Sequence, residues 1–362
     1  PLRTLRSNRA WEQVRSIWRP TSMAADGDSG ALVTSGEPTG TGAFVRLDEE
    51  APWVYRDSAP GGTTSVALDG RRAYVAWRRD RTVWRFDEDD SPTRIAGTGE
   101  WRSPRQIVVG AAALVVLVVL GWNFGVVGAL VGLANVLAVT LAGLARYFRD
   151  GVPATSARLA APAAVAVDEA GRVYIAEEGS SRVRIVDTDG TISTAVGRAF
   201  RAGRADGGPT SSACLSRPTG LAVDQSGSLY VADAGNRSIC RTTPEGTIST
   251  VAGGSSAPVA PDGAPARTAR LGRPMGLAIA EDGTLFVADK DNNRVRAIDV
   301  DGVIRTVAGS GAAGSGGTEG PARSAELRRP YDVAVVGGTL FIADTGNRRI
   351  CEVDLFPRYV SR

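Results

Sequence analysis

The chain has 362 residues, 43% of them hydrophobic, and a formal net charge of +3, which excludes a disordered chain and allows a sizeable core. Histidine is absent, so the chain alone cannot form a serine–histidine catalytic pair, and a structural zinc site is nearly excluded. The odd count of three cysteines predicts free thiols, and no basic run interleaved with aromatic residues indicates nucleic-acid binding.

Near the start of the chain, Gly27-Asp28-Ser29-Gly30 resembles the nucleophile loop of a trypsin-type protease. Without histidine, Ser29 has no general base within this chain. Alignment with repeats further along places the segment at a turn between two strands, so we expect Ser29→Ala to remove no activity. The chain begins at Pro1 and is rich in arginine, and we interpret it as the C-terminal part of a larger bacterial protein.

Two stretches in the first part of the chain alternate apolar with small or polar residues over short runs, which predicts β-strands. They begin at Pro20 and Thr63 and match a four-strand pattern that is clearer further along the chain. The unit from Pro20 has one residue more than this pattern, and the unit from Thr63 has one residue fewer. We expect residues 11–18 to supply the strand that closes the last repeat. Residues 1–106 therefore form the first predicted part of the chain.

A long apolar segment interrupts the strand pattern. The spacing from Thr63 to the next unit at Pro162 is 99 residues, and the excess coincides with residues 107–148. This segment predicts two membrane-spanning helices, because both of its ends belong to one rigid domain and the chain must return to the side it left. A hairpin that packs on a partner protein or enters one leaflet is the alternative interpretation.

Arginine and tryptophan residues flank the apolar segment and indicate its orientation. The positive-inside rule places the rest of the chain in the cytoplasm, at a bacterial inner membrane. The predicted membrane contacts are Trp101, Arg102, Arg105, Trp122, Arg146, Arg149, Arg78 and Arg79. For Arg78 and Arg79, an ordinary solvated arginine cluster is an equal alternative.

The remaining residues, 149–362, carry one pattern that recurs every 56 residues. Its prolines are Pro162, Pro218, Pro274 and Pro330. In the unit from Pro218, the predicted strands are "GLAVD", "SLYVAD", "SICRTT" and "TISTVAG". Four-stranded units at this spacing predict a β-propeller, whose radial closure leaves few exposed sheet edges. Together with the two earlier units, the repeats predict six blades.

These units resemble NHL repeats, and linkers such as "DGGPTSSACL" and "DGAPARTARL" resemble those of bacterial NHL propellers. The resemblance implies an all-β, six-bladed propeller of the NHL type. The apolar two-helix hairpin is then inserted between the second and third blades. The resemblance also implies an interaction module, because bacterial NHL propellers include sensor domains of receptor-like kinases.

Two sets of acidic residues are candidates for chemistry. The first recurs beside one turn of each repeat, as Asp233-Asn236, Asp289-Asn292-Arg294, Asp344-Asn347-Arg349 and the variant Glu177-Ser180-Arg182. The second ends four predicted innermost strands, at Asp26, Asp69, Asp168 and Asp224. For both sets, side chains that close turns are the preferred interpretation, and a metal site is the alternative.

The sequence as a whole favours a non-catalytic, membrane-tethered propeller that binds a protein or senses a ligand. We expect no cofactor, and as partners a lipid bilayer through residues 107–148 and an unidentified protein or small ligand, but no nucleic acid. The alternative function is a propeller hydrolase, lactonase or lyase that uses a metal at the channel mouth. A sensor on the outer side of the membrane is a third possibility.

Overall fold

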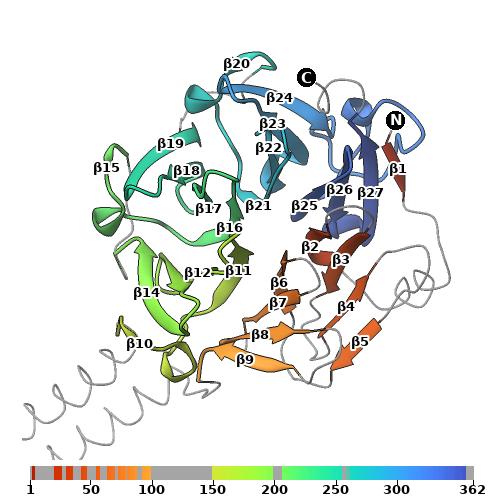
Figure 1. Ribbon diagram of the computed structural model, residues 1–362. Coiled ribbons are helices and arrows are strands. Elements are labelled where there is room, and N and C mark those ends of the chain that lie inside the picture. The colour runs from red at the N-terminus through yellow and green to blue at the C-terminus, as the bar shows by residue number, and fades with distance from the viewer. Residues whose placement is uncertain are drawn as a thin grey trace, which may run out of the picture.

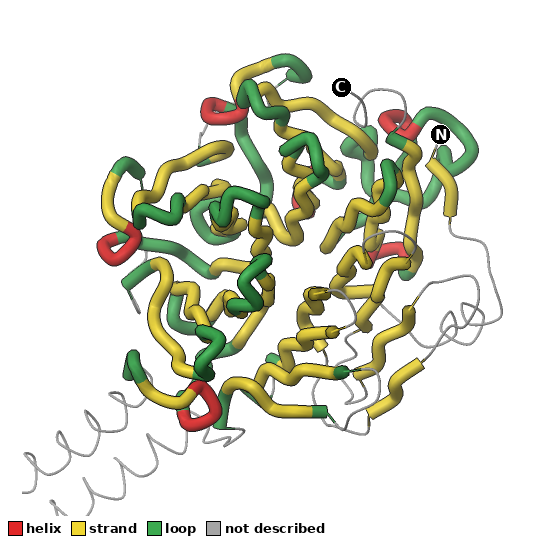
Figure 2. The backbone as a smooth tube through the Cα atoms, viewed as in Figure 1, coloured by secondary structure: helices red, strands yellow, loops and turns green. Residues whose placement is uncertain are grey.

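The structure, a computed structural model, consists of antiparallel sheets arranged as a ring (Figure 1). It describes residues 2–4, 20–26, 30–35, 42–46, 54–57, 63–69, 72–78, 80–87, 92–98, 149–198, 206–254, 259 and 261–355. Strands dominate these residues, and the helices among them are single short turns (Figure 2). The all-β fold expected from the alternating pattern is therefore confirmed.

Six sheets are present, numbered here in chain order by their innermost strand. Sheets 1 and 2 are four-stranded meanders. Their strands are β2 (Pro20–Asp26), β3 (Gly30–Ser35), β4 (Gly42–Arg46) and β5 (Val54–Asp57), then β6 (Thr63–Asp69), β7 (Arg72–Trp77), β8 (Thr82–Phe86) and β9 (Thr93–Ala96). Sheet 1 is described almost entirely as backbone, whereas side chains are described over most of the five other sheets.

Sheets 3, 4 and 5 come from the 56-residue repeats and have five strands each. Sheet 3 contains β10 (Val152–Pro153), β11 (Pro162–Val167), β12 (Val173–Glu177), β13 (Arg182–Val186) and β14 (Thr191–Val196). Sheet 4 contains β15 (Gly208–Pro209), β16 (Pro218–Val223), β17 (Leu229–Asp233), β18 (Ser238–Thr242) and β19 (Thr247–Gly253). Sheet 5 contains β20 (Ala264–Pro265), β21 (Pro274–Ile279), β22 (Leu285–Asp289), β23 (Arg294–Ile298) and β24 (Val303–Ala308).

The two ends of the chain meet in sheet 6. Its three C-terminal strands are β25 (Asp332–Val336), β26 (Thr339–Asp344) and β27 (Arg349–Asp354). The fourth strand is β1 (Leu2–Thr4), which pairs antiparallel with β27. An N-terminal strand therefore pairs with the last strand, but it is β1 and not the predicted segment 11–18, which lies outside the described residues. Three residues of mixed polarity carry too little pattern to be recognised as a strand in advance.

The core lies between neighbouring sheets rather than in a single layer. One cluster joins Tyr174 and Val183 of sheet 3 to Leu221 and Val231 of sheet 4, and similar clusters join the sheets that follow. The innermost strands β2, β6, β11, β16, β21 and β25 lie next to one another in that order, and β25 returns to β2. Each sheet thus buries its apolar faces against its two neighbours.

The helices of the described residues are 3-10 turns of three residues each. They lie in the linkers and turns, as η2 (Ala154–Ser156), η3 (Thr210–Ser212), η4 (Ala266–Thr268), η5 (Lys290–Asn292), η6 (Ala322–Ser324) and η7 (Thr345–Asn347). Such a turn rises about 6 Å, whereas a hydrocarbon layer is about 30 Å thick. Among the residues that the structure describes, no helix has the length and apolar character to cross a membrane.

The predicted fold class therefore requires correction in its helical part. The structure described is an all-β propeller without an inserted two-helix hairpin, and the transmembrane helices and membrane localisation expected from the sequence are corrected with it. The segment that prompted them, residues 107–148, lies outside the described residues. The division of the chain at 106 and 149 stays a prediction.

Candidate functional site

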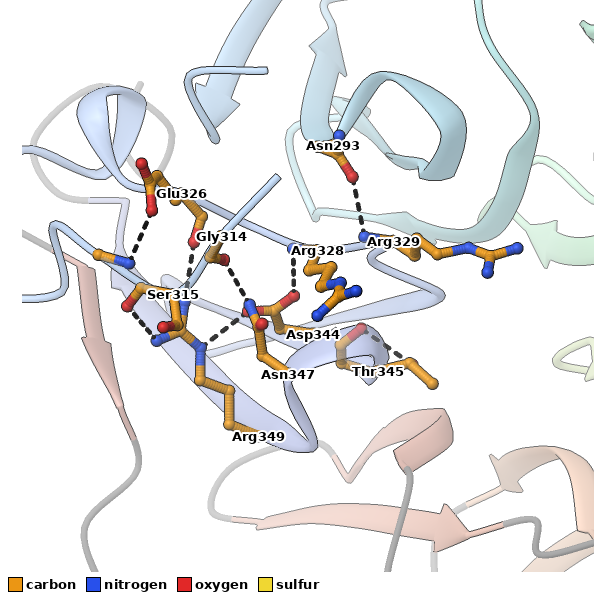
Figure 3. A network of polar contacts seen from close by, with 12 residues as sticks. Asn293, Gly314, Ser315, Glu326, Arg328, Arg329, Asp344, Thr345, Asn347 and Arg349 are labelled. Atoms are coloured by element: carbon orange, nitrogen blue, oxygen red, sulfur yellow. Dashed lines mark hydrogen bonds and ion pairs between the residues drawn. The ribbon is translucent and has the colours of Figure 1, made fainter. Parts of the chain in front are cut away.

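The last four sheets each carry a buried carboxylate at the end of the second strand. In sheet 6, one oxygen of Asp344 accepts the backbone N–H of Arg328 at 2.7 Å. Its other oxygen accepts Asn347 and Arg349, both at 2.7 Å (Figure 3). The carboxylate therefore ties the segment before the innermost strand to the turn after the second strand.

The equivalent residues of sheets 3, 4 and 5 repeat this arrangement. Glu177, Asp233 and Asp289 each accept a backbone N–H with one oxygen and a serine or asparagine side chain with the other. The preferred interpretation of the first acidic set, closure of a turn, is thus confirmed. Since protein donors already occupy these oxygens, we do not place the functional site here.

Asp233 differs from Glu177, Asp289 and Asp344 in the residue five positions further along the chain. Where sheets 3, 5 and 6 have Arg182, Arg294 and Arg349, sheet 4 has Ser238. Burial raises the pKa of Asp233 to about 7, although hydrogen bonds from Ser216 and Asn236 act in the opposite direction. This carboxyl therefore titrates near neutrality inside the sheet.

The second acidic set lies at the opposite ends of the innermost strands. Asp168 accepts the backbone N–H groups of Ala170 and Arg172 and the Arg172 guanidinium at 2.7 Å. Asp224 accepts the N–H of Ser228 at 2.9 Å. Both aspartates therefore close the turn between the first and second strands, as expected. Within the described residues, no cluster of three or more acidic or cysteine side chains is placed to hold a metal ion.

The remaining members of that set lie in the first two sheets. Asp26 ends β2 and is paired in register with Gly30 of β3, whereas Asp69 ends β6 opposite Arg72 of β7. Ser29, between the paired strands β2 and β3, lies outside the described residues. Its role as part of a turn therefore stays a prediction, although the pairing of its flanking strands agrees with it.

A pocket of about 450 Å³, called the mouth pocket below, lies where the innermost strands begin and the second strands end. Its charged lining comes from four sheets and consists of Arg78, Glu178, Arg217, Arg237, Arg273 and Lys290. Tyr331 of sheet 6 adds an aromatic wall. Among the described residues, five cationic side chains and a single carboxylate therefore converge on one hollow, which makes it the candidate functional site.

Glu178 holds two of these arginines. Its carboxylate is almost fully buried and lies 2.5 Å from Arg78 of sheet 2 and 2.5 Å from Arg217 of sheet 4. Both guanidinium groups remain partly exposed. The three residues form a bridge across three sheets that leaves the outer sides of the arginines open to the pocket.

Lys290 and Tyr331 also line the pocket and contact each other. The lysine ammonium lies 4.9 Å from the centre of the tyrosine ring, an attractive cation–π distance. Burial lowers the pKa of Lys290, and the positive charges of Arg329 and Arg273 lower it further, while the carboxylates of Asp291 and Glu178 act in the opposite direction. Burial also raises the pKa of the Tyr331 hydroxyl. An anion bound beside this ammonium would therefore stabilise its charged form.

A larger hollow of about 860 Å³ lies between sheets 4 and 5, beside the turns that follow their innermost strands. Its charged lining carries both signs, with Asp224, Glu281, Asp299, Asp301, Arg241 and Arg267. Because both signs of charge line this hollow, whereas the described lining of the mouth pocket is mainly cationic, we consider the mouth pocket the stronger candidate.

Two of the eight predicted membrane contacts are described. Arg78 lines the mouth pocket. The exposed Arg149 precedes β10, and its backbone oxygen accepts a hydrogen bond from the Arg184 guanidinium at 2.9 Å. Trp101, Arg102, Arg105, Trp122, Arg146 and Arg79 lie outside the described residues. Contact of these residues with a bilayer stays a prediction, as does the alternative of a solvated cluster. Arg78 is partly exposed and forms an ion pair with Glu178.

Sequence reasoning missed most of the mouth pocket. A signal was present, because Arg217, Arg273 and Arg329 precede three repeat prolines at the same 56-residue spacing. Lys290 is also the only lysine of the chain. Neither feature indicated that loops from four sheets meet at one point, since that depends on closure of the ring.

Comparisons with known proteins agree with the repeat assignment. The Teneurin NHL domain family matches residues 145–205 and 257–317, and the NHL repeat family matches residues 215–241. Teneurin-4 of Mus musculus is 31% identical over 227 residues, which cover 56% of this chain and 8% of teneurin-4. The chain thus spans less than a tenth of that relative.

Two solved structures share the fold. An auxiliary nutrient binding protein from Bacteroides thetaiotaomicron has a TM-score of 0.60 at 13% identity, over 93% of this chain and 69% of that protein. A streptogramin B lyase has a TM-score of 0.53 at 11% identity, over 97% of this chain and 96% of the lyase. At such identities the likeness concerns the fold alone.

The predicted bacterial origin, and with it the bacterial inner membrane, is also corrected. The sequence relatives are eukaryotic proteins, among them the teneurins of mouse, human, zebrafish and fly. An arginine-rich, lysine-poor composition indicates only a codon bias, so it did not identify the source. The matched families and the sheet topology together show that the chain carries NHL repeats folded as a β-propeller.

Proposed function

We propose that this propeller is a non-catalytic module that binds a protein partner on the face around the mouth pocket. The observation that carries the proposal is the convergence of five cationic side chains from three sheets on one hollow. Binding sites are typically concave and present a few convergent polar groups. The described carboxylates of the two acidic sets are engaged in turns, so they do not compete as binding groups.

A binding role fits this pocket better than catalysis. General acid–base chemistry needs titratable groups that can reach a substrate and exchange a proton. The single carboxylate of the pocket, Glu178, is instead held by two arginines. The likeness to a lyase extends to the fold alone, and a fold does not carry its chemistry with it.

Selection of peptides tests the proposal. A random peptide library displayed on phage is panned on the whole 362-residue chain, and the selected peptides are assayed against two pocket variants, Arg273→Gln and Lys290→Gln. The control is Arg323→Gln on η6, an exposed arginine that lies outside the mouth pocket and pairs with Asp262. We expect the pocket variants to weaken binding about tenfold, as loss of charge-assisted hydrogen bonds does, and the control to leave it unchanged.

The proposal is wrong if no peptide is enriched over an empty support. It is also wrong if the enriched peptides bind the pocket variants and the wild type equally well. Circular dichroism of each variant distinguishes a loss of binding from a loss of folding.

A further inference from the structure

We infer that the group received by the mouth pocket is a compact oxyanion, a carboxylate or a phosphate monoester, held between Arg273 and Lys290. The inference rests on the proposed function, which it deepens by naming the chemistry of the group that the partner presents. It is carried by the geometry and the charge balance of the pocket.

The pocket has more cations than its own carboxylate can neutralise. Glu178 is shared by Arg78 and Arg217. Arg273 has a distant ion pair with Asp291 at 3.6 Å, in which both side chains are substantially exposed. Within the described part of the chain, neither Lys290 nor Arg237 forms a salt bridge with a carboxylate. An incoming anion therefore meets cations whose charge is only partly compensated.

Lys290 occupies a position where an anion is expected to stabilise the charged ammonium. It is half-buried in the pocket wall, and its ammonium lies over Tyr331. The nearby Arg273 and Arg329 oppose its positive charge, and the smaller effects of Asp291 and Glu178 offset this only in part. An oxyanion between Lys290 and Arg273 reverses this repulsion and receives donors from an ammonium and a planar guanidinium, the combination that suits carboxylates and phosphates.

The geometry favours one compact anion over a nucleic-acid strand. Single-stranded nucleic acids are bound along grooves that combine a track of positive charge with aromatic faces for base stacking. Here the cations converge on one hollow of about 450 Å³. The aromatic wall, Tyr331, has the Lys290 ammonium over its face. Glu178, held by two arginines of the same pocket, already shows how a carboxylate is accommodated there.

The single lysine makes a direct experiment possible. Reductive methylation with ¹³C-formaldehyde labels Lys290, and peptide mapping separates this label from that of the chain terminus. The whole chain is then titrated with glutarate, with O-phosphoserine, with neutral glutaramide and with a single-stranded RNA oligonucleotide. The methyl resonance of Lys290 is followed against concentration and against pH in each arm.

We expect glutarate, O-phosphoserine or both to shift the Lys290 resonance saturably and to raise its pKa, with glutaramide inactive. Arg273→Gln should weaken the response about tenfold, whereas Arg323→Gln should leave it unchanged. A response to neither oxyanion overturns the inference. Tighter binding of RNA than of both small oxyanions, at matched ionic strength, overturns it in favour of a nucleic-acid site. Because the probes contain no peptide, this failure is distinct from a failure of the panning experiment.

Discussion

Glu178 and Arg217 form an ion pair of 2.5 Å that joins the end of a second strand in sheet 3 to the start of the innermost strand in sheet 4. Arg78 of sheet 2 binds the same carboxylate from the other side. A single buried anion thus links three sheets at the channel mouth and leaves the pocket with a surplus of positive charge. Glu178 should therefore affect both the stability of the fold and the binding of anions in the pocket.

Replacing Glu178 by Gln should separate the two roles. The loss of the carboxylate leaves Arg78 and Arg217 facing each other, and we expect the free energy of unfolding to fall by about 1–2 kcal/mol, because both arginines are partly solvated. The same change makes the pocket more positive, so glutarate should bind more tightly. Urea unfolding and the Lys290 resonance measure the two effects, and weaker glutarate binding to a folded Glu178→Gln variant would contradict the surplus-charge argument.

Asp344→Ala tests the turn that Figure 3 shows. Removal of this buried carboxylate leaves the Arg328 N–H and the mostly buried Arg349 without their shared acceptor. We expect the free energy of unfolding, measured with urea, to fall by about 3 kcal/mol, as for other broken buried charge pairs. Asp354→Ala, at the exposed end of β27, is the matched control and should change stability by less than about 0.5 kcal/mol.

The raised pKa of Asp233 predicts a pH-dependent stability. Burial raises this pKa from 3.8 to about 7, so the folded state holds a proton that the unfolded state releases near pH 4. The contribution to stability is fully present below about pH 4 and is lost as the pH rises through 7, by up to about 4 kcal/mol. Asp233→Asn should flatten the unfolding free energy between pH 4 and 7. If the unfolding free energy changed equally with pH in the wild type and in Asp233→Asn, the raised pKa of Asp233 would be refuted.

Replacement of Gly309 tests a close approach between a glycine and the backbone of a neighbouring turn, which recurs in four sheets. The φ of Gly309 is +94°, and a Cβ atom at this position would lie 2.3 Å from the backbone oxygen of Asn293. Gly309→Ala should therefore destabilise the protein by about 2–3 kcal/mol through strain and displacement of the neighbouring turn. Gly302→Ala has a comparable φ of +76° but open space around its Cβ, so it should cost only about 1 kcal/mol. Similar losses for the two variants would exclude the close contact as the cause.

The regular repeats explain why the fold was largely predictable. The strands assigned to the unit from Pro218 correspond to β16–β19, because alternation with period two and the turn residues between runs are local properties. The acidic turn residues were also predictable, since their partners lie in the same sheet within 17 positions of sequence. Local patterns, however, gave no indication that β1 pairs with β27, because that pairing connects opposite ends of the chain.

The errors came from features whose meaning depends on more than local pattern. Hydropathy alone suggested membrane helices and, with the flanking arginines, a bacterial inner membrane. No helix of the described residues is long and apolar enough to cross a membrane, and the relatives named above are eukaryotic. For Arg78 the sequence left a membrane rim and a solvated cluster as equal alternatives, and its contact with a bilayer stays a prediction. In the folded chain Arg78 belongs to the Glu178 bridge, because the turns after β7 and β12 meet at the channel mouth.

The sequence by itself determined the strands, their repeat of 56 residues and the propeller that such units build, because each follows from side-chain periodicity and turn chemistry within one unit. Only the tertiary structure decided that Arg78, Glu178, Arg217, Arg273 and Lys290 share one pocket. These residues lie up to 212 positions apart, and their convergence arises when neighbouring sheets bury their apolar faces and close the ring.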